Sequence, residues 1–251
     1  MANENPYLNN PYESPNPYAY GNVAAYAAEN ERTTFLRKTY LHLMGAVLAF
    51  VGIEVALFKS GLGESMVQTI FTGRWSWLIV MGAFLLVSYV ANKWAYSATS
   101  KATQYAGLSL FVVAEAIIFL PILWIVQNMY PNGNEMLATA ALITTVLFGG
   151  LTATVLLTKA DLSWMGRGLM FAGFAMFGVI IVAAIMGFNL GLWFSVLGAA
   201  LMCGYILYET SAMMHHMRTD QYVAASLALF SSLATLFYYV LRIVMATQSR
   251  D

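Results

Sequence analysis

The sequence predicts an all-α integral membrane protein whose chain crosses the bilayer seven times. Hydrophobic residues make up 60% of the 251 residues and charged residues only 10%, whereas soluble domains average about 45–50% and about 25%. Long apolar runs also alternate with short polar links along the chain. A water-soluble globule of this size could not cover so much apolar surface with polar residues, so a soluble enzyme is excluded.

Seven apolar runs are long enough to cross a membrane, because about 20 residues of helix span the hydrocarbon core. They cover residues 39–58, 75–92, 105–126, 136–157, 168–188, 191–213 and 222–245. The runs lack the polar–apolar alternation of membrane β-strands. Backbone groups in lipid must find their partners within the chain, so we expect a helical bundle.

The first 34 residues differ from the rest of the chain. They contain four of the six prolines and three copies of Asn-Pro-Tyr. They lack the basic segment and apolar core of a cleaved signal peptide. We predict a disordered cytosolic tail over 1–34, of which the first 30 residues are dispensable for folding, and a transmembrane domain over 35–251. The repeats are either a docking motif or a spacer, and the spacer is the favoured interpretation.

Composition excludes several other functions. Twelve basic residues balance twelve acidic ones, so no net charge points to nucleic acid. The single cysteine, Cys203, excludes an intrachain disulfide framework and a multi-cysteine metal site. The sequence contains no H-E-x-x-H, G-x-S-x-G or P-loop motif. We therefore predict neither an enzyme nor a bound cofactor or metal.

Three acidic residues fall inside the apolar runs: Glu54, Glu115 and Glu209. A charge at bilayer depth is costly, and such residues usually face a bundle interior or a water path. No Lys or Arg lies at comparable depth, so desolvation favours the neutral, protonated form of each acid. These residues are candidate sites for reversible binding of protons or cations. The alternative is a structural role, in which each acid hydrogen-bonds a neighbouring helix.

The last run carries small and hydroxyl residues at alternating spacings of three and four. They are Ala225, Ala228, Ser232, Thr235, Tyr239 and Arg242. This spacing places them on one helix face, which predicts a helix–helix contact surface. Because the preceding run is joined to this one by a short link, we expect Ser232 and Thr235 to donate hydrogen bonds to Glu209.

Several segments resemble the Bax inhibitor family, the transmembrane BAX inhibitor motif proteins. They are Met-Cys-Gly-Tyr-Ile-Leu-Tyr-Glu-Thr-Ser at 202–211, Lys-Ala-Asp-Leu-Ser-Trp at 159–164, and Ala-Ser-Leu-Ala-Leu-Phe at 225–230. The triplet Ala-Asn-Lys at 91–93 is similar to the bacterial branch whose members modulate a membrane protease. The resemblance covers about residues 35–250 and excludes the tail.

The resemblance implies a seven-helix fold in which the last helix is central. Some family members are pH-sensitive calcium leak channels with two acids that share a proton and a basic residue that latches them. The first acid corresponds to Glu209, the second to Ser232, and the basic latch to the neighbourhood of Asn92 or Lys93. With Ser232 in place of an acid, the sensor is incomplete.

The expected function is therefore that of a non-enzymatic regulator in the inner cell membrane. Its implied partners are the lipid bilayer and a membrane-anchored ATP-dependent protease or other components of membrane-protein quality control. The alternative is a pH-sensitive leak channel for calcium or another cation built around Glu209, with Ca²⁺ or protons as its ligands and with Glu54 or Glu115 replacing the missing acid.

We predict a cytosolic N-terminus and an external C-terminus. In this orientation eight basic residues lie on the inner side and four on the outer side, as the positive-inside rule requires. A reporter enzyme that is active only outside the cytosol, fused after residue 251, should be active. Activity of a cytosolic reporter at the same position would contradict the seven-span topology and imply six spans with a re-entrant last segment.

Overall fold

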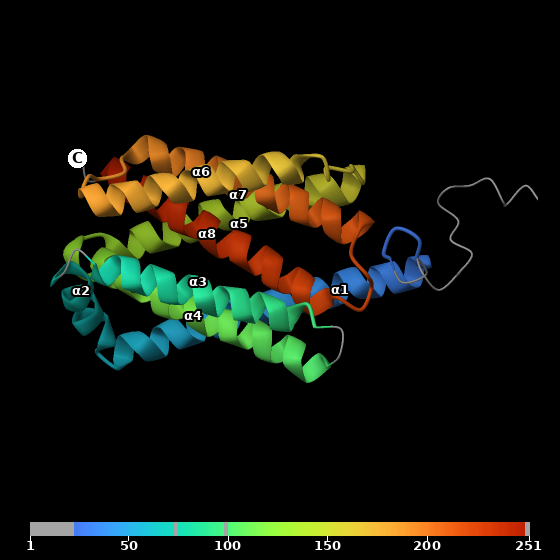
Figure 1. Ribbon diagram of the computed structural model, residues 1–251, viewed down its shortest axis with the longest axis horizontal. Helices are drawn as coiled ribbons and strands as arrows, with labels where there is room; N and C mark the ends of the chain where they lie inside the picture. The colour runs from blue at the N-terminus through green and yellow to red at the C-terminus, as the bar shows by residue number, and fades with distance from the viewer. Residues whose placement is uncertain (1–22, 73–74, 98–99, 249–251) are drawn as a thin grey trace, which may run out of the picture.

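The computed structural model describes residues 23–72, 75–97 and 100–248, which form eight α-helices joined by short links (Figure 1). The helices are α1 (Glu29–Lys59), α2 (Leu62–Thr72), α3 (Ser76–Ala95), α4 (Lys101–Met129), α5 (Gly133–Thr158), α6 (Met165–Met186), α7 (Leu192–His215) and α8 (Tyr222–Gln248). All except α2 are long and apolar enough to cross a membrane. The predicted all-α bundle of seven membrane helices is confirmed.

The short helix α2 lies in the link between the first two predicted runs, where the sequence predicts no helix. Its 11 residues would extend about 16 Å, too little to cross the hydrocarbon core. A Cβ atom on Gly63 would lie 2.4 Å from the Trp124 ring, so α2 approaches the end of α4 closely. Val67 is buried in the same region. The helix forms because the side chains on one of its faces can pack on the bundle.

The last helix, α8, lies at the centre of the bundle. It contacts α1, α3, α4, α5 and α7, and Figure 1 shows it running diagonally between the layer of α6 and α7 and the layer of α3 and α4. Its side chains Leu236 and Leu241 are fully buried. Helix α6 differs. All of its residues are described, and Ala183 is the only buried one among them. The central last helix implied by the family resemblance is therefore observed.

The small and hydroxyl stripe of α8 packs along α7. Ser232 lies beside Glu209. A Cβ atom on Gly198 would lie 2.5 Å from the ring of Tyr239, so the missing side chain leaves room for this ring against α7. Near the end of α8, Arg242 Nη2 donates a hydrogen bond of 2.7 Å to a carbonyl in the α6–α7 link. The stripe is a helix–helix contact surface, as its spacing predicts.

Aromatic rings join α1, α4 and α8 on the other side of α8. The ring of Phe50 meets those of Phe119 and Phe230 at centroid distances of 5.4 and 6.0 Å, and Phe111 meets Phe230 at 6.2 Å. All three pairs are edge-to-face, a favourable arrangement for aromatic rings. These three helices run in the same direction. The end of the bundle at which they begin is called the proximal end here, and the opposite end the distal end.

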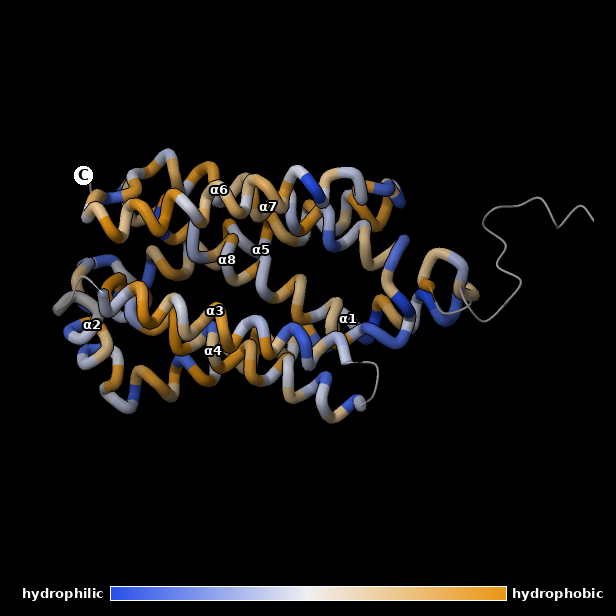
Figure 2. The backbone as a smooth tube through the Cα atoms, viewed as in Figure 1, coloured by the Kyte–Doolittle hydropathy of each residue, from blue (hydrophilic) through white to orange (hydrophobic). Residues whose placement is uncertain are grey.

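Hydrophilic residues collect towards the ends of the bundle and the helix midsections are mostly hydrophobic (Figure 2). Many large apolar side chains on the outside of the bundle are exposed, among them Leu48, Leu86 and Phe174. Such a surface is unfavourable in water and suits contact with lipid. The distribution of exposed apolar side chains is that of a membrane-spanning bundle.

Part of the segment predicted as a tail packs on the bundle. Residues 1–22 lie outside the described residues. Ala24 is fully buried, and its N–H donates a 2.9 Å hydrogen bond to the carbonyl of Met217 in the α7–α8 link. Helix α1 begins at Glu29, before the predicted boundary at residue 34. Acidic residues in a first turn interact favourably with the helix dipole, and Glu29 and Glu31 occupy that turn.

The substitution Gly107→Ala should destabilise the protein. A Cβ atom there would lie 2.5 Å from the carbonyl oxygen of Ala91 and 2.6 Å from the amide nitrogen of Ala95, so α3 and α4 would have to separate. Overpacking of this kind costs about 1–3 kcal/mol. Thermal unfolding in detergent should show the loss. The matched control is Gly149→Ala, where no atom lies within 4 Å of the new Cβ. Equal stability of the two variants would contradict the close contact.

Candidate functional site

Glu209 projects from α7 into its contact with α8. The side chain of Ser232 on α8 lies within hydrogen-bonding reach of the carboxyl group. The second carboxyl oxygen, Oε2, is buried and has no hydrogen-bond partner in the described part of the chain. The residue is half-buried as a whole, and its carboxyl has one neutral neighbour within hydrogen-bonding reach, as the sequence led us to expect for Ser232. Thr235, the other expected donor, instead bonds to the carbonyl of Ser231 in its own helix.

Two tyrosine side chains lie near Glu209. Tyr205 lies one turn earlier on α7, and Tyr96 lies at the end of α3. Tyr205 Oη donates a 3.0 Å hydrogen bond to the carbonyl of Leu169 on α6. Tyr96 was not identified from the sequence, because no spacing pattern relates the end of α3 to the middle of α7.

The structure does not bring Glu54 or Glu115 to Glu209. Glu54 on α1 is only 5% exposed, and neither of its carboxyl oxygens has a hydrogen-bond partner within the described residues. Glu115 on α4 is 4% exposed and lies between Phe111 and Phe119, on the face that packs towards α8. Neither acid acts electrostatically on Glu209. The three candidate acids occupy three separate places in the bundle.

Lys93, the candidate basic latch, is exposed on α3. Ala91 and Ala95, on the opposite side of the same helix, pack against Gly107. The ion pairs found among the described residues are His216 with Asp161 and Arg218 with Asp220, and neither involves Glu209. No group of three or more His, Cys, Asp or Glu side chains within residues 23–72, 75–97 and 100–248 is placed to hold a metal ion.

A second set of polar groups lies on the other side of α7. The hydroxyl of Tyr40 on α1 faces the side chains of Thr152 on α5 and Thr210 on α7 but makes no well-aligned hydrogen bond to either. Thr210 Oγ1 donates instead to the carbonyl of Ile206, at 2.7 Å. Buried polar groups without protein partners are commonly satisfied by internal water. Polar side chains therefore lie beside Thr210 as well as beside Glu209, its neighbour on α7.

Two segments that carry the family resemblance meet at the proximal end of α7. Ser211 Oγ donates a 3.0 Å hydrogen bond to the carbonyl of Ala160 and accepts a 2.8 Å bond from the N–H of Leu162, so it joins α7 to the α5–α6 link. In that link the Ser163 N–H donates to the Asp161 carboxylate and holds the pKa of this acid below its usual value. The position of the link depends on α7 two residues after Glu209.

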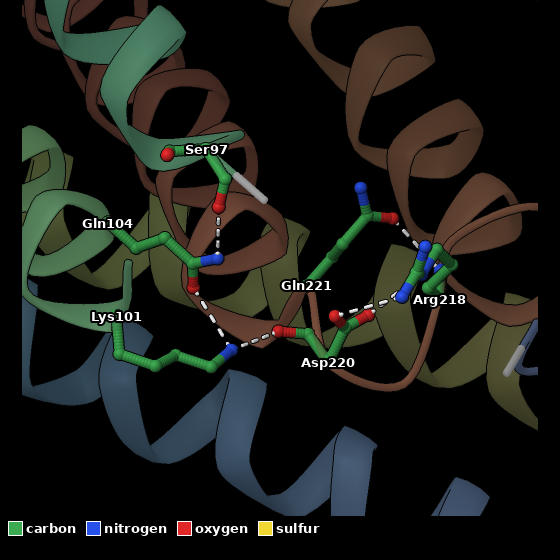
Figure 3. Close-up of polar contacts among 6 residues, drawn as sticks. All are labelled: Ser97, Lys101, Gln104, Arg218, Asp220 and Gln221. Atoms are coloured by element: carbon green, nitrogen blue, oxygen red, sulfur yellow. Dashed lines mark hydrogen bonds and ion pairs between the residues drawn. The ribbon is translucent and has the colours of Figure 1, made fainter. Parts of the chain in front are cut away.

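The links at the proximal end are joined by a second hydrogen-bond network (Figure 3). Gln104 Nε2 donates a 2.6 Å bond to the carbonyl of Ser97, and Lys101 Nζ donates to Gln104 Oε1 and to the carbonyl of Asp220. The Asp220 carboxylate accepts two bonds from Arg218, at 3.0 and 3.2 Å. The network ties the α3–α4 link to the α7–α8 link.

Comparison with known proteins identifies the relatives of this chain. It is 28% identical to protein lifeguard 4 of Mus musculus over 93% of both chains. It is 30% identical to an uncharacterized protein of Pseudomonas aeruginosa over 88% of this chain and 92% of that one. It is also 30% identical to the Golgi anti-apoptotic protein of vaccinia virus (strain Lister), over 44% of this chain and 47% of that one.

The sequence model of the family described as inhibitor of apoptosis-promoting Bax1 matches residues 32–250. This range includes all seven membrane helices except the first three residues of α1. It also includes Glu209, Ser232 and both segments joined by Ser211. The chain is therefore a multi-pass membrane protein that belongs to the Bax inhibitor family.

Proposed function

We propose that the chain is a non-catalytic membrane regulator that binds a membrane-anchored ATP-dependent protease in the inner cell membrane, in the orientation with a cytosolic N-terminus. Membership of the Bax inhibitor family and a relative named for an anti-apoptotic role support a regulatory function. The similarity of residues 91–93 to the protease-modulating branch supports the choice of partner. The proximal end then faces the cytosol.

The observation that favours regulation over ion conduction is the pairing of Glu209 with Ser232. A single buried carboxyl can take up and release one proton. Calcium requires six to eight oxygen ligands, commonly several of them carboxylates, and neither Glu54 nor Glu115 reaches this position. The site is better suited to respond to protons than to pass a divalent cation.

Protonation of Glu209 would act through the contact between α7 and α8. A neutral carboxyl fits beside Ser232, whereas a carboxylate would place an uncompensated charge in a buried contact. Loosening of α7 would also move Ser211, which holds the α5–α6 link. The proton signal would thereby reach the proximal surface, where the proposed protease would bind.

The alternative function is a pH-sensitive cation leak. Glu54 supports it, because both of its carboxyl oxygens are buried without partners. The unpaired hydroxyls of Tyr40 and Thr152 support it further, because internal water could hydrogen-bond to them. In this alternative Glu209 would gate a water-filled path through the bundle.

The wild-type protein should lose thermal stability as pH rises, and Glu209→Gln should lose less. Ionisation of Glu209 destabilises the α7–α8 contact, and each kcal/mol lowers the Tm of a protein this size by about 2–4 °C. Glutamine keeps the shape of the side chain and cannot ionise. Melting curves in detergent between about pH 5 and 8 measure the difference. Glu64→Gln, on the surface of α2, is the control. Identical pH profiles for wild type and Glu209→Gln would leave Glu209 as a packing residue only.

Purification of the tagged full-length chain from native membranes should bring down an ATP-dependent membrane protease. Addition of the chain should change the rate at which that protease degrades a membrane substrate.

Liposomes that contain the chain alone should release calcium no faster than empty liposomes. Fast calcium release that Glu209→Gln abolishes, without any bound protease, would reject the regulator and support the leak channel.

A further inference from the structure

A groove runs between α1 and α4 on the outside of the bundle. Its volume is about 430 Å³, within the range of small-molecule sites. The α1 side is formed by Leu41, Gly45, Ala49 and Ile53, which recur every four residues and so share one helix face. Ala46 and Val112 are buried in its floor. The groove exists because small residues on α1 leave space beside the larger residues of α4.

The length of the groove matches the hydrocarbon thickness of one bilayer leaflet. Residues 41–53 of a helix extend about 18 Å, and one leaflet of a hydrocarbon core about 30 Å thick extends about 15 Å. Leu41 and Val113 line the groove and are 54% and 41% exposed. An acyl chain lying along α1 would thus contact apolar side chains over the depth of one leaflet.

The proximal end of the groove is basic and aromatic. His42 lines the groove there, and its ring stacks on Tyr105 and lies 5.1 Å from the ring of Tyr222. Lys38 Nζ and Lys101 Nζ lie 5.2 and 4.5 Å from the centroid of the same Tyr222 ring. Side chains from α1, α4 and α8 therefore meet at the point where the groove would emerge from the hydrocarbon.

The hydrogen bonds of His42 fix its tautomer. The carbonyl of Lys38 can only accept, so Nδ1 is the donor in the 2.6 Å bond between them. In the neutral ring, Nε2 then accepts from the Tyr105 hydroxyl at 3.0 Å. The Tyr222 hydroxyl lies 3.5 Å from that of Tyr105. The two tyrosine hydroxyls and the imidazole form one chain of polar groups beside the lysines.

The two lysines gather positive charge that no acid among the described residues offsets. Both lie over one ring, so their ammonium groups are no more than about 10 Å apart, which is about one Debye length at 0.1 M salt. Neither lysine takes part in an ion pair in the described part of the chain. The Asp220 carboxylate beside Lys101 already binds Arg218 (Figure 3). An anion at this position would relieve the repulsion between the two ammonium groups.

We propose that this groove binds one anionic phospholipid, with its phosphate between Lys38 and Lys101 and one acyl chain along α1. The phosphate oxygens accept hydrogen bonds from the ammonium groups and from the Tyr222 hydroxyl, and the apolar groove shields the chain. The site lies on the face of α4 away from Glu209, and the proposal is independent of the protease or leak function.

A second copy of the chain fits this face less well than a lipid does. Two copies in one membrane face each other through a two-fold axis along the membrane normal, which places equivalent residues opposite one another. The lysines of one copy would then lie against those of the other. Charge complementarity therefore favours an anionic headgroup.

Native mass spectrometry of the full-length protein in detergent tests the proposal. Phosphatidylglycerol and phosphatidylcholine with identical acyl chains are titrated in parallel. We expect tighter binding of phosphatidylglycerol, and about a fivefold loss of that binding for each of Lys38→Gln and Lys101→Gln. Gly45→Leu should weaken binding of both lipids about tenfold. Its new Cβ meets no atom within 4 Å and its side chain enters the groove.

Matched variants serve as controls. Lys159→Asn with Arg167→Gln removes two exposed charges elsewhere, and Gly150→Leu fills equally open space on α5. Both should bind phosphatidylglycerol as the wild type does, and lipid-free melting curves establish that every variant is folded. The proposal is overturned if the two lipids bind equally to the wild type. It is also overturned if a control variant loses as much lipid binding as the groove variant to which it is matched. Two further results would overturn it: glycerol phosphate alone competing as well as the lipid, or Gly45→Leu dissociating a dimer.

Discussion

The contact between α7 and α8 determines the rest of this structure. The two helices fit together because Gly198 on α7 accommodates the ring of Tyr239 on α8, and because Ser232 on α8 lies beside Glu209 on α7. Lipid supplies no hydrophobic force between helices, so close packing and hydrogen bonds must hold them together. With α7 fixed on one side, the remaining surface of α8 is free to receive α1, α4 and α5. The central position of α8 follows from that arrangement.

In the proposed function, the same contact would let one acid influence the whole bundle. Glu209 lies in this contact beside Ser232, and its Oε2 atom has no hydrogen-bond partner among the described residues. In a loosely packed region, a change of charge would be absorbed by water. In the proposed function, a charge in this contact would be met by movement of α7, and α7 carries Ser211 and the hydrogen bonds to the α5–α6 link. A local proton equilibrium would thereby be coupled to the shape of the proximal surface.

The sequence alone predicted the seven membrane helices and the stripe on α8, because both depend on periodicity within one segment. The partnership of Glu209 with Ser232 also followed, since a short link forces the two helices to be neighbours. The sequence did not predict α2, whose 11 residues give too short a pattern. It missed Tyr96 and the cluster around Tyr222, because these sites are assembled from helices far apart in the chain. It left open whether Glu54 and Glu115 reach Glu209. That distance depends on how each helix is rotated about its axis, and a helix that is apolar on most sides leaves this rotation undetermined.

The common direction of α1, α4 and α8 has an electrostatic consequence of its own. Each helix places roughly half a positive charge at its N-terminus through the alignment of its peptide dipoles. Lys101 and Tyr222 are the first residues of α4 and α8, so two of these helix ends meet where the lysines gather. The C-termini of α3 and α7 lie at the same end, joined by short links to α4 and α8, and their negative dipole ends offset this field. The positive charge gathered there therefore depends on the side chains of Lys38 and Lys101 rather than on the backbone.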